Sequence, residues 1–237
     1  MKNVRLTKEQ RIINRLLLES SMIQDIGLLH GKTGIMLFFM HYYRFTSNVL
    51  YEDVASELLD EITNNLNEAS PINFESGLCG IGWAINYLIA KNFVEGDSLD
   101  ICEDINNKIM ETDPRRLTDY SLENGLGGIL LYVLSSINVV YSQQQKLPFD
   151  IDYIHSLYIA CINVLHSKKL PSNVINLLES YIKFYIDKTL HADSIWDISL
   201  IIERIANLNE KKISNYPLGL KQGLSGTLFN ELYLCKL

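Results

Sequence analysis

Residues 75–89 read ESGLCGIGWAINYLI, in which Gly77 and Gly80 open an apolar run of helical length. Three other windows repeat this G-x-x-G pattern, and 12 of the 13 glycines in the 237-residue chain fall at 27–34, 77–82, 125–128 and 219–226. A glycine inside a helix costs about 1 kcal/mol relative to alanine. We therefore expect these pairs in the first helical turn, where they let a neighbouring helix or loop approach and leave backbone N–H groups facing a central space. The windows are GKTGIMLFF at 31–39, GLCGIGWAI at 77–85, GLGGILLYV at 125–133 and GLSGTLFNE at 223–231.

The four windows recur at a nearly constant period. Their first glycines stand at positions 31, 77, 125 and 223, which gives spacings of 46, 48 and 98 residues. Because 98 is twice 49, the period predicts a degenerate fifth copy near residue 174. There Pro171, Ser172 and Asn173 are residue types that start helices, although the glycines are missing.

More polar segments lie between the apolar runs, and their apolar residues recur at helical spacing. In residues 49–66, for example, Val54, Leu58 and Ile62 alternate with acidic residues. Thr7 and Gln10 have the spacing of a capping box at the start of the first such segment. We expect amphipathic helices at 7–22, 49–66, 97–109, 150–166 and 194–208.

These two kinds of helix predict an all-α fold of about five helical hairpins, with G-x-x-G at the starts of the inner helices. Amphipathic helices would form an outer layer and apolar helices an inner one, in an (α/α) toroid or an open horseshoe. We expect residues 1–237 to form a single domain of this kind.

Composition excludes several classes of protein. With 47% hydrophobic and 21% charged residues, the chain is expected to be globular, and its net charge of −7 argues against nucleic-acid binding. Residues 125–141 carry no charge, but 17 residues are fewer than the roughly 20 that a bilayer requires. We expect a buried helix there, no membrane span, and a cytoplasmic protein without a signal peptide. The cysteines form no CxxC pair and are expected to be reduced: Cys79, Cys102, Cys161 and Cys235.

The four windows, with the residues that precede them, resemble the lanthionine synthetase C-like (LanC-like) family. The resemblance is carried by LLHGKTGIMLFF, ESGLCGIGWAINYLI, ENGLGGILLYVL and KQGLSGTLFNEL. It implies an (α/α) toroid, built in the family from about seven hairpins, and a role in peptide modification. Catalytic members add cysteine thiols of a precursor peptide across dehydroalanine or dehydrobutyrine, and a zinc ion held by two Cys and one His activates the thiol.

In the family the zinc ligands stand directly before the G-x-x-G of two late repeats. In this sequence only His30 has a matching residue type at such a position, and no Cys-His-Gly occurs. We therefore predict no metal, no cofactor and no catalytic residue. The expected function is peptide binding in the central cavity, without zinc-dependent cyclase activity, during lanthionine or thioether-type natural-product maturation. The residues that precede the glycines are Leu29-His30, Glu75-Ser76, Glu123-Asn124 and Lys221-Gln222.

Five residues near the inner-helix starts are candidates for substrate contact in the cavity. All of them except Gln222 also have a structural interpretation. The His30 ring can hydrogen-bond a neighbouring loop, Cys79 can fill a position that is small in every copy, and acidic side chains are favourable near positive helix ends. The candidates are His30, Glu75, Cys79, Glu123 and Gln222.

Two alternative functions remain open at this point. An open arc of five hairpins would leave apolar edges that dock a partner protein or form a homo- or hetero-oligomer. A carbohydrate-active toroid would need two carboxylates about 5–10 Å apart, for which Glu75, Asp119 and Glu123 are available. Such a toroid usually has aromatic platforms in its loops, whereas we expect Trp83 and Trp196 within helices.

Overall fold

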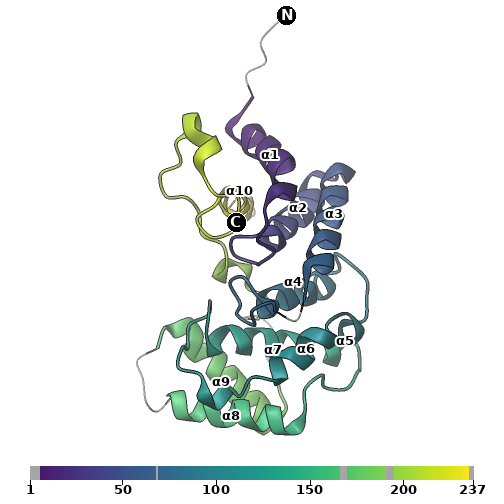
Figure 1. Ribbon diagram of the computed structural model, residues 1–237, viewed down its shortest axis with the longest axis vertical. Helices are drawn as coiled ribbons and strands as arrows, with labels where there is room; N and C mark the ends of the chain where they lie inside the picture. The colour runs from purple at the N-terminus through teal and green to yellow at the C-terminus, as the bar shows by residue number, and fades with distance from the viewer. Residues whose placement is uncertain (1–5, 68, 166–169, 191–194, 235–237) are drawn as a thin grey trace, which may run out of the picture. The chain divides into compact units, whose positions relative to one another are not determined.

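The computed structural model describes residues 6–67, 69–165, 170–190 and 195–234 (Figure 1). The chain folds as two compact units. Unit 1 comprises Met1–Asn67 and Ile198–Leu237, and unit 2 comprises Glu68–Asp197. Unit 1 is therefore built from both ends of the chain.

In unit 1 the central helix is α2, which packs against α3 as a helical hairpin and also contacts α10. Helix α1 lies against α10, and the expected Thr7–Gln10 capping box opens α1. The elements of this unit are α1 (Lys8–Glu19), η1 (Ser20–Met22), α2 (Lys32–Thr46), α3 (Val49–Asn65), η3 (Ile198–Leu200), η4 (Glu210–Asn215) and α10 (Leu224–Leu234).

In unit 2 the central helix is α7, which contacts both α4 and α9, while α8 packs against α9. Three expected inner helices, α4, α7 and α9, are thus neighbours in chain order. The degenerate copy near residue 174 is confirmed as α9. The elements are α4 (Leu78–Ala90), α5 (Ser98–Ile101), α6 (Glu103–Met110), η2 (Pro114–Arg116), α7 (Leu126–Ser142), α8 (Ile151–Leu165) and α9 (Ser172–Asp187).

Burial separates the inner helices α4 and α7 from the outer helix α3 as the sequence predicted, whereas the expected inner helix α9 is buried on one face only. Helix α4 is buried from Leu78 to Leu88, and α7 from Leu126 to Ile137, whereas α3 buries only Ala55, Leu58 and Ile62. The uncharged stretch at 125–141 is the buried helix α7. Within the described ranges, no helix combines the length and apolar character needed to cross a bilayer. The all-α class and the helical-hairpin organisation are confirmed.

The expected outer helices at 194–208 and 97–109 are corrections. The helix expected at 97–109 is broken into α5 and α6 at Cys102. Of the range 194–208 the structure describes residues 195–208, which contain only the short η3, and Trp196 lies outside any helix. At Glu203 the backbone instead pairs with the loop before α10. The Glu203 N–H donates to the Leu220 carbonyl at 3.1 Å, and the Gln222 N–H donates to the Glu203 carbonyl at 2.8 Å. Tertiary backbone pairing has overridden the helical spacing of the side chains. The expected end of the 150–166 helix, His166, lies outside the described residues.

The glycine pairs allow each inner helix to receive its own preceding loop. The residue after the first glycine donates its N–H to the carbonyl seven positions earlier, for example Leu78 to Pro71 at 2.8 Å and Leu126 to Asp119 at 3.0 Å. These helix-start N–H groups therefore donate to their own loops. The expectation that they face a central space was wrong. The same bond occurs from Lys32 to Asp25 and from Leu224 to Pro217.

Consecutive loops are joined by a repeated backbone hydrogen bond. In unit 2 the Glu75 N–H donates to the Glu123 carbonyl at 3.0 Å, which links the second copy to the third. In unit 1 the Lys221 N–H donates to the Leu29 carbonyl at 2.9 Å, at the equivalent loop positions. The last copy is thus joined to the first by the same bond that joins neighbouring copies.

The side chains of unit 1 complete this junction. The Phe229 ring of α10 lies 6.0 Å from the Phe38 ring and 4.7 Å from the His41 ring of α2, measured between centroids. The first and last inner helices are the two edges that an open horseshoe would expose. These two helices pack on each other and so are not the exposed edges that the alternative assumed, while docking of a partner stays a prediction.

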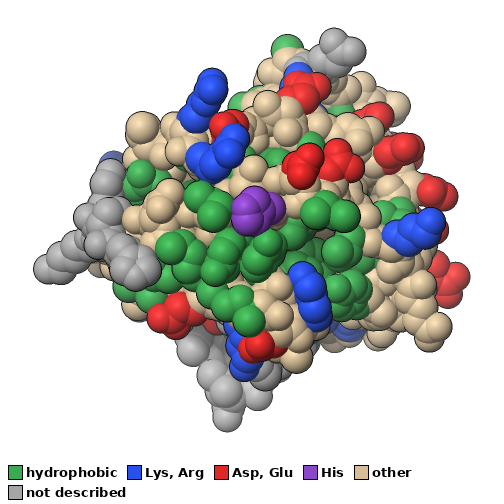
Figure 2. Space-filling view, turned by 90° about the horizontal axis from the view of Figure 1, so that it is seen from below, with side chains coloured by type: hydrophobic (Ala, Val, Ile, Leu, Met, Phe, Trp, Pro, Cys, Tyr) green, Lys and Arg blue, Asp and Glu red, His purple; other side chains and the backbone are tan. Residues whose placement is uncertain are grey.

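An apolar surface covers α8 and α9 in unit 2. Figure 2 views the side on which these helices lie and shows hydrophobic side chains gathered around a histidine. Tyr158 and Tyr185 stack with centroids 4.2 Å apart, and the Tyr185 hydroxyl lies 2.8 Å from His155 Nδ1. Ile151 and Ile186 are 85% and 61% exposed. Helix α8 therefore has apolar residues on its outer face as well as its inner one.

Candidate functional site

Two candidates, His30 and Gln222, lie together at a pocket of unit 1. The pocket has a volume of about 500 Å³. It forms because the loops before α2 and α10 are joined by the Lys221–Leu29 hydrogen bond, which brings the residues in front of both glycine pairs to one place. The lining residues are His30, Glu203, Arg204, Ile205, Ala206, Tyr216, Pro217, Lys221 and Gln222.

Gln222 has an unusual backbone conformation for its place in the fold. It has a φ of 52°, in the left-handed region that non-glycine residues rarely adopt. Ser47, Asn92, Gln144 and Lys188 share this conformation, but each directly follows or caps the end of an inner helix, where it is common. Gln222 instead precedes a helix, and its side-chain amide donates to Glu203 Oε1 at 2.8 Å. Strain of this kind, about 1–3 kcal/mol, gathers at functional sites.

The pocket combines an apolar wall with charged groups. Ile205, Ala206 and Pro217 contribute apolar surface, and the Tyr216 hydroxyl accepts the Asn209 N–H at 2.9 Å, which fixes the ring. His30, Arg204 and Lys221 provide basic side chains, against the single carboxylate of Glu203. A concave apolar site with a few convergent polar groups is the usual form of a ligand-binding site.

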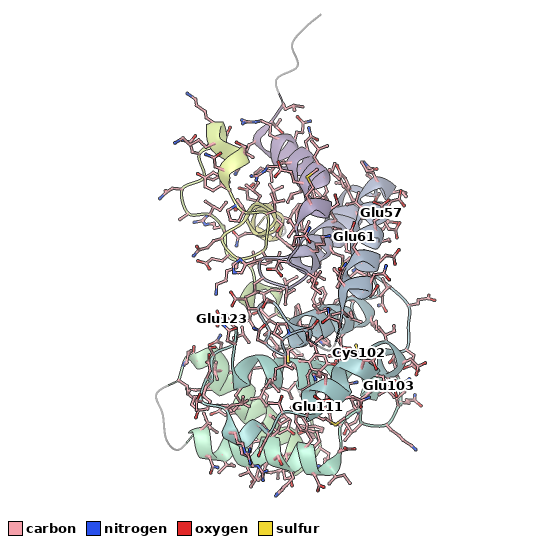
Figure 3. The ribbon with its side chains drawn as sticks, in the orientation of Figure 1. Glu57, Glu61, Cys102, Glu103, Glu111 and Glu123 are labelled. Carbon is pink, nitrogen blue, oxygen red and sulfur yellow. The ribbon has the colours of Figure 1, made fainter. Side chains whose placement is uncertain are left out.

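Glu75 and Glu123 lie together in unit 2, in the loops before α4 and α7. The Glu123 carbonyl accepts the N–H groups of Phe74 and Glu75, at 2.9 and 3.0 Å. Asn124 donates to Glu75 Oε2 at 3.1 Å. Figure 3 shows Glu123 in its loop. The five candidates thus divide between the units, His30 and Gln222 in unit 1 and the others in unit 2.

A comparison with family models identifies the family. The model described as "Lanthionine synthetase C-like protein" matches residues 22–173, which is more than half of the chain. The chain belongs to the lanthionine synthetase C-like family. No curated protein matches it. In this LanC-like chain the matched region runs from the loop before α2 to the start of α9, and α10 lies beyond it.

The zinc site of the catalytic relatives does not fit the described part of this LanC-like chain. The loop positions expected to hold ligands carry His30 and otherwise Leu, Glu, Ser, Asn, Lys and Gln. In the ranges that the structure describes, no three His, Cys, Asp or Glu residues are placed to hold a metal ion. His166, His191 and Cys235 lie outside those ranges. The expected absence of a metal stays a prediction.

Cys79 does not reach the surface of this LanC-like protein. Its side chain is fully buried, and burial raises the pKa of the thiol well above its usual range. Thiolates bind metals and attack electrophiles, so a raised pKa disfavours both roles. The geometry supports the interpretation of Cys79 as a small core residue. The expectation that Cys79 contacts a substrate is corrected, because its side chain is buried.

Asp119 does not have the property required of the acid in glycoside hydrolysis. Asp119 Oδ1 accepts the Ser121 N–H at 2.8 Å, and this bond lowers the pKa of the carboxyl group. A glycosidase acid needs a raised pKa. Trp196 lies outside a helix, contrary to our expectation, but its indole N–H donates to Asn138 at 3.1 Å and its ring lies 6.4 Å from that of Trp83. It is packed within unit 2 and is no loop platform.

Glu203, Arg204 and Tyr216 were not predicted as site residues. Residues 194–208 were expected on an outer helix, where Glu203 and Arg204 would lie on a solvated face. The loops themselves carried a usable signal. Each loop has an apolar residue three positions before its first glycine, and all four of these residues are buried: Leu28, Phe74, Leu122 and Leu220. This recurrence marks each loop as a packed element that a neighbouring segment can pair with.

Proposed function

We propose that this LanC-like protein binds a peptide during lanthionine or other thioether-type natural-product maturation, and that the unit 1 pocket contacts the peptide. The observation that carries the proposal is the meeting of His30 and Gln222 in this pocket, with Gln222 in a strained conformation. Family membership supplies the link to peptide modification. The proposal locates the protein in the cytoplasm, as its sequence predicts.

The proposed role excludes zinc-dependent cyclisation. Its support is the residue types that precede each glycine pair, since His30 is the single match to a zinc ligand there. Binding by the pocket requires only shape and hydrogen bonds. Peptide backbone groups would meet the His30 ring and the Gln222 amide, and an apolar side chain would lie against Ile205 and Pro217.

Peptide binding is tested by selection from a phage-displayed library of random 12-residue peptides, followed by calorimetry on the selected sequences. Ala206→Trp fills the pocket, and Ser56→Trp adds the same side chain to an exposed position of α3. We expect Ala206→Trp to weaken binding at least 10-fold and Ser56→Trp to leave it unchanged. Failure to select any peptide, or equal effects of the two variants, would overturn the proposal.

The zinc-free part is tested separately by metal analysis of the purified protein and by a cyclisation assay. Thioether formation does not change peptide mass, so iodoacetamide labelling of a synthetic peptide that contains cysteine and dehydroalanine counts the remaining thiols. We expect substoichiometric zinc and full labelling after incubation with the protein. One zinc per chain, or protein-dependent loss of labelling, contradicts this part of the proposal.

A further inference from the structure

We infer that the unit 1 pocket recognises a carboxylate of the bound peptide, next to an apolar side chain. The inference rests on the proposed peptide binding and adds the class of peptide. The carboxylate can come from an aspartate or glutamate side chain or from a peptide C-terminus.

The first observation is the charge of the pocket lining. His30, Arg204 and Lys221 are basic, and Glu203 is acidic. One oxygen of Glu203 already accepts the Gln222 amide at 2.8 Å, which holds this carboxylate against the wall of the pocket. The remaining side chains favour an anion.

The second observation concerns Arg204. The other arginines of the described chain each have a partner, as Arg15 has in Glu19 and Arg115 has in Asp113. Arg204 makes no ion pair with any described residue and lines the pocket. An arginine presents a planar set of donors that fits a carboxylate with two parallel hydrogen bonds. An unpaired arginine at a pocket is therefore suited to this ligand.

The third observation is the contrast with the whole molecule. The chain carries a net charge of −7, so its long-range field repels acidic peptides. Several basic side chains elsewhere are neutralised by acids, for example Lys32 by Glu61 and Lys108 by Glu111. A locally basic pocket on an acidic protein favours a carboxylate at the pocket, whereas the net charge of the chain as a whole disfavours it.

The apolar wall of the pocket indicates which kind of side chain lies next to the carboxylate of the ligand. Ile205, Ala206 and Pro217 lie beside the charged groups, and about 500 Å³ is more than one carboxylate fills. An aliphatic side chain adjacent to the acidic residue would cover this wall and remove apolar surface from water.

The test uses fluorescence anisotropy with labelled 10-residue peptides. One amidated peptide has a central Leu-Glu pair, a second has Leu-Gln, a third has Leu-Lys, and a fourth has Leu-Gln with a free C-terminus. We expect the Leu-Glu peptide or the free C-terminus to bind at least 10-fold tighter than the amidated Leu-Gln peptide. The preference should shrink as salt is raised, because the pocket is open to solvent. These arms distinguish an internal acid from a terminal carboxylate.

Arg204→Gln should reduce the preference for acid to about twofold or less while the affinity for the Leu-Gln peptide stays within twofold. Lys211→Gln, which makes the same charge change on η4 of the same unit, should leave the preference intact. Lys221→Met provides a second pocket variant, and circular dichroism checks the fold of each. Equal binding of acidic and amidated neutral peptides overturns the inference but leaves peptide binding standing. The inference is also overturned if none of the four peptides binds while library peptides do. If neither the four peptides nor any library peptide binds, the proposed function is overturned.

Discussion

At Gly34, Gly128 and Gly226 the preceding loop closely approaches the second glycine of the G-x-x-G pair. A Cβ atom at Gly34 would meet the Leu28 carbonyl oxygen, and it would lie 2.7 Å from Leu220 Cγ. At Gly128 the Leu122 carbonyl and the Phe74 side chain stand in the same relation. The glycines therefore serve packing between successive loops. None of the described glycines has a positive φ, so conformational freedom is not the reason for them.

Gly34→Ala is expected to lower the free energy of unfolding by about 2–3 kcal/mol, because the backbone of the Leu28 loop must move to admit a methyl group. Gly96→Ala is the matched control. It meets only the flexible end of the Ile101 side chain, at 2.6 Å, and should change stability by less than about 0.5 kcal/mol. Urea denaturation followed by circular dichroism measures both. Equal losses would show that the loop contact is not what requires glycine.

Cys102 links pH to stability at the residue scale. Burial raises the pKa of its thiol from 9.0 to about 12. Below pH 9 the thiol is protonated in both folded and unfolded chains, so it adds no pH dependence. Between pH 9 and 12 only the unfolded chain ionises, which lowers the free energy of unfolding by up to about 1.4 kcal/mol per pH unit.

We expect Cys102→Ala to reduce the loss of stability between pH 8 and pH 10 relative to the unmodified chain, by about 1 kcal/mol. Urea titrations at the two pH values measure the difference. The partly exposed Ser156, changed to Ala, serves as a control that should leave the pH dependence unaltered. An identical alkaline loss in both proteins would contradict the assignment to Cys102.

At the scale of elements, a buried polar network joins α4, α5 and α7 in unit 2. Asn86 donates to Ser135 Oγ at 3.1 Å and to Ser136 Oγ at 2.9 Å, and it accepts from Ser98 Oγ at 2.6 Å. Asn86 and both serines of α7 are at most 1% exposed. A buried network of this kind fixes the register of the three helices, because any shift leaves polar groups unpaired.

Asn86→Ala should therefore cost about 3 kcal/mol of folding free energy, since it leaves buried serine hydroxyls without their partner. Asn163→Ala removes the same amide from an exposed position of α8 and should cost less than about 0.5 kcal/mol. Thermal and urea unfolding report both changes. A loss below about 1 kcal/mol for Asn86→Ala would contradict the role of the network.

The inner helices were predictable from the sequence because their signal is local. Glycine pairs, long apolar runs and a constant period located α2, α4, α7 and α10, and the period alone located α9. The segment at 194–208 was not predictable in this way. Its side chains have helical spacing, but its backbone pairs with the loop before α10, and such a contact between distant residues leaves no periodic trace.

The candidate site, like the fold, could be predicted only in part. The residues before the glycine pairs were identified, and His30 and Gln222 do lie together. Glu203 and Arg204 were missed because they lie on the segment whose structure was mispredicted. The sequence left open whether Cys79 is buried in the core or lines the cavity, because a small residue at its position fits both.

At the scale of the whole molecule, the sequence period gives no indication that the chain divides into two units. The repeats look equivalent along the sequence, yet the last copy packs with the first, and the middle copies form unit 2. Only the contact of α10 with α2 establishes this arrangement, and it joins residues almost two hundred positions apart.

Phe229→Ala should destabilise unit 1 by about 3–5 kcal/mol, because the ring is fully buried against Phe38 and His41. Phe45→Ala, at a 52% exposed position of α2, should cost less than about 1 kcal/mol. Hydrogen exchange distinguishes the outcomes by element: the amides of α2 and α10 should lose protection together in Phe229→Ala. Loss of protection in α10 alone would contradict the pairing of the first and last copies.

The contact between Phe38 and Phe229 also sets an order of events during synthesis. A ribosome adds about 5–20 residues per second, so α2 emerges roughly 10–40 s before the aromatic ring that covers it. Unit 2 is continuous in sequence and is complete before α10 exists. During this interval the face of α2 that packs on α10 is not yet covered by that helix, so unit 1 is completed only after unit 2.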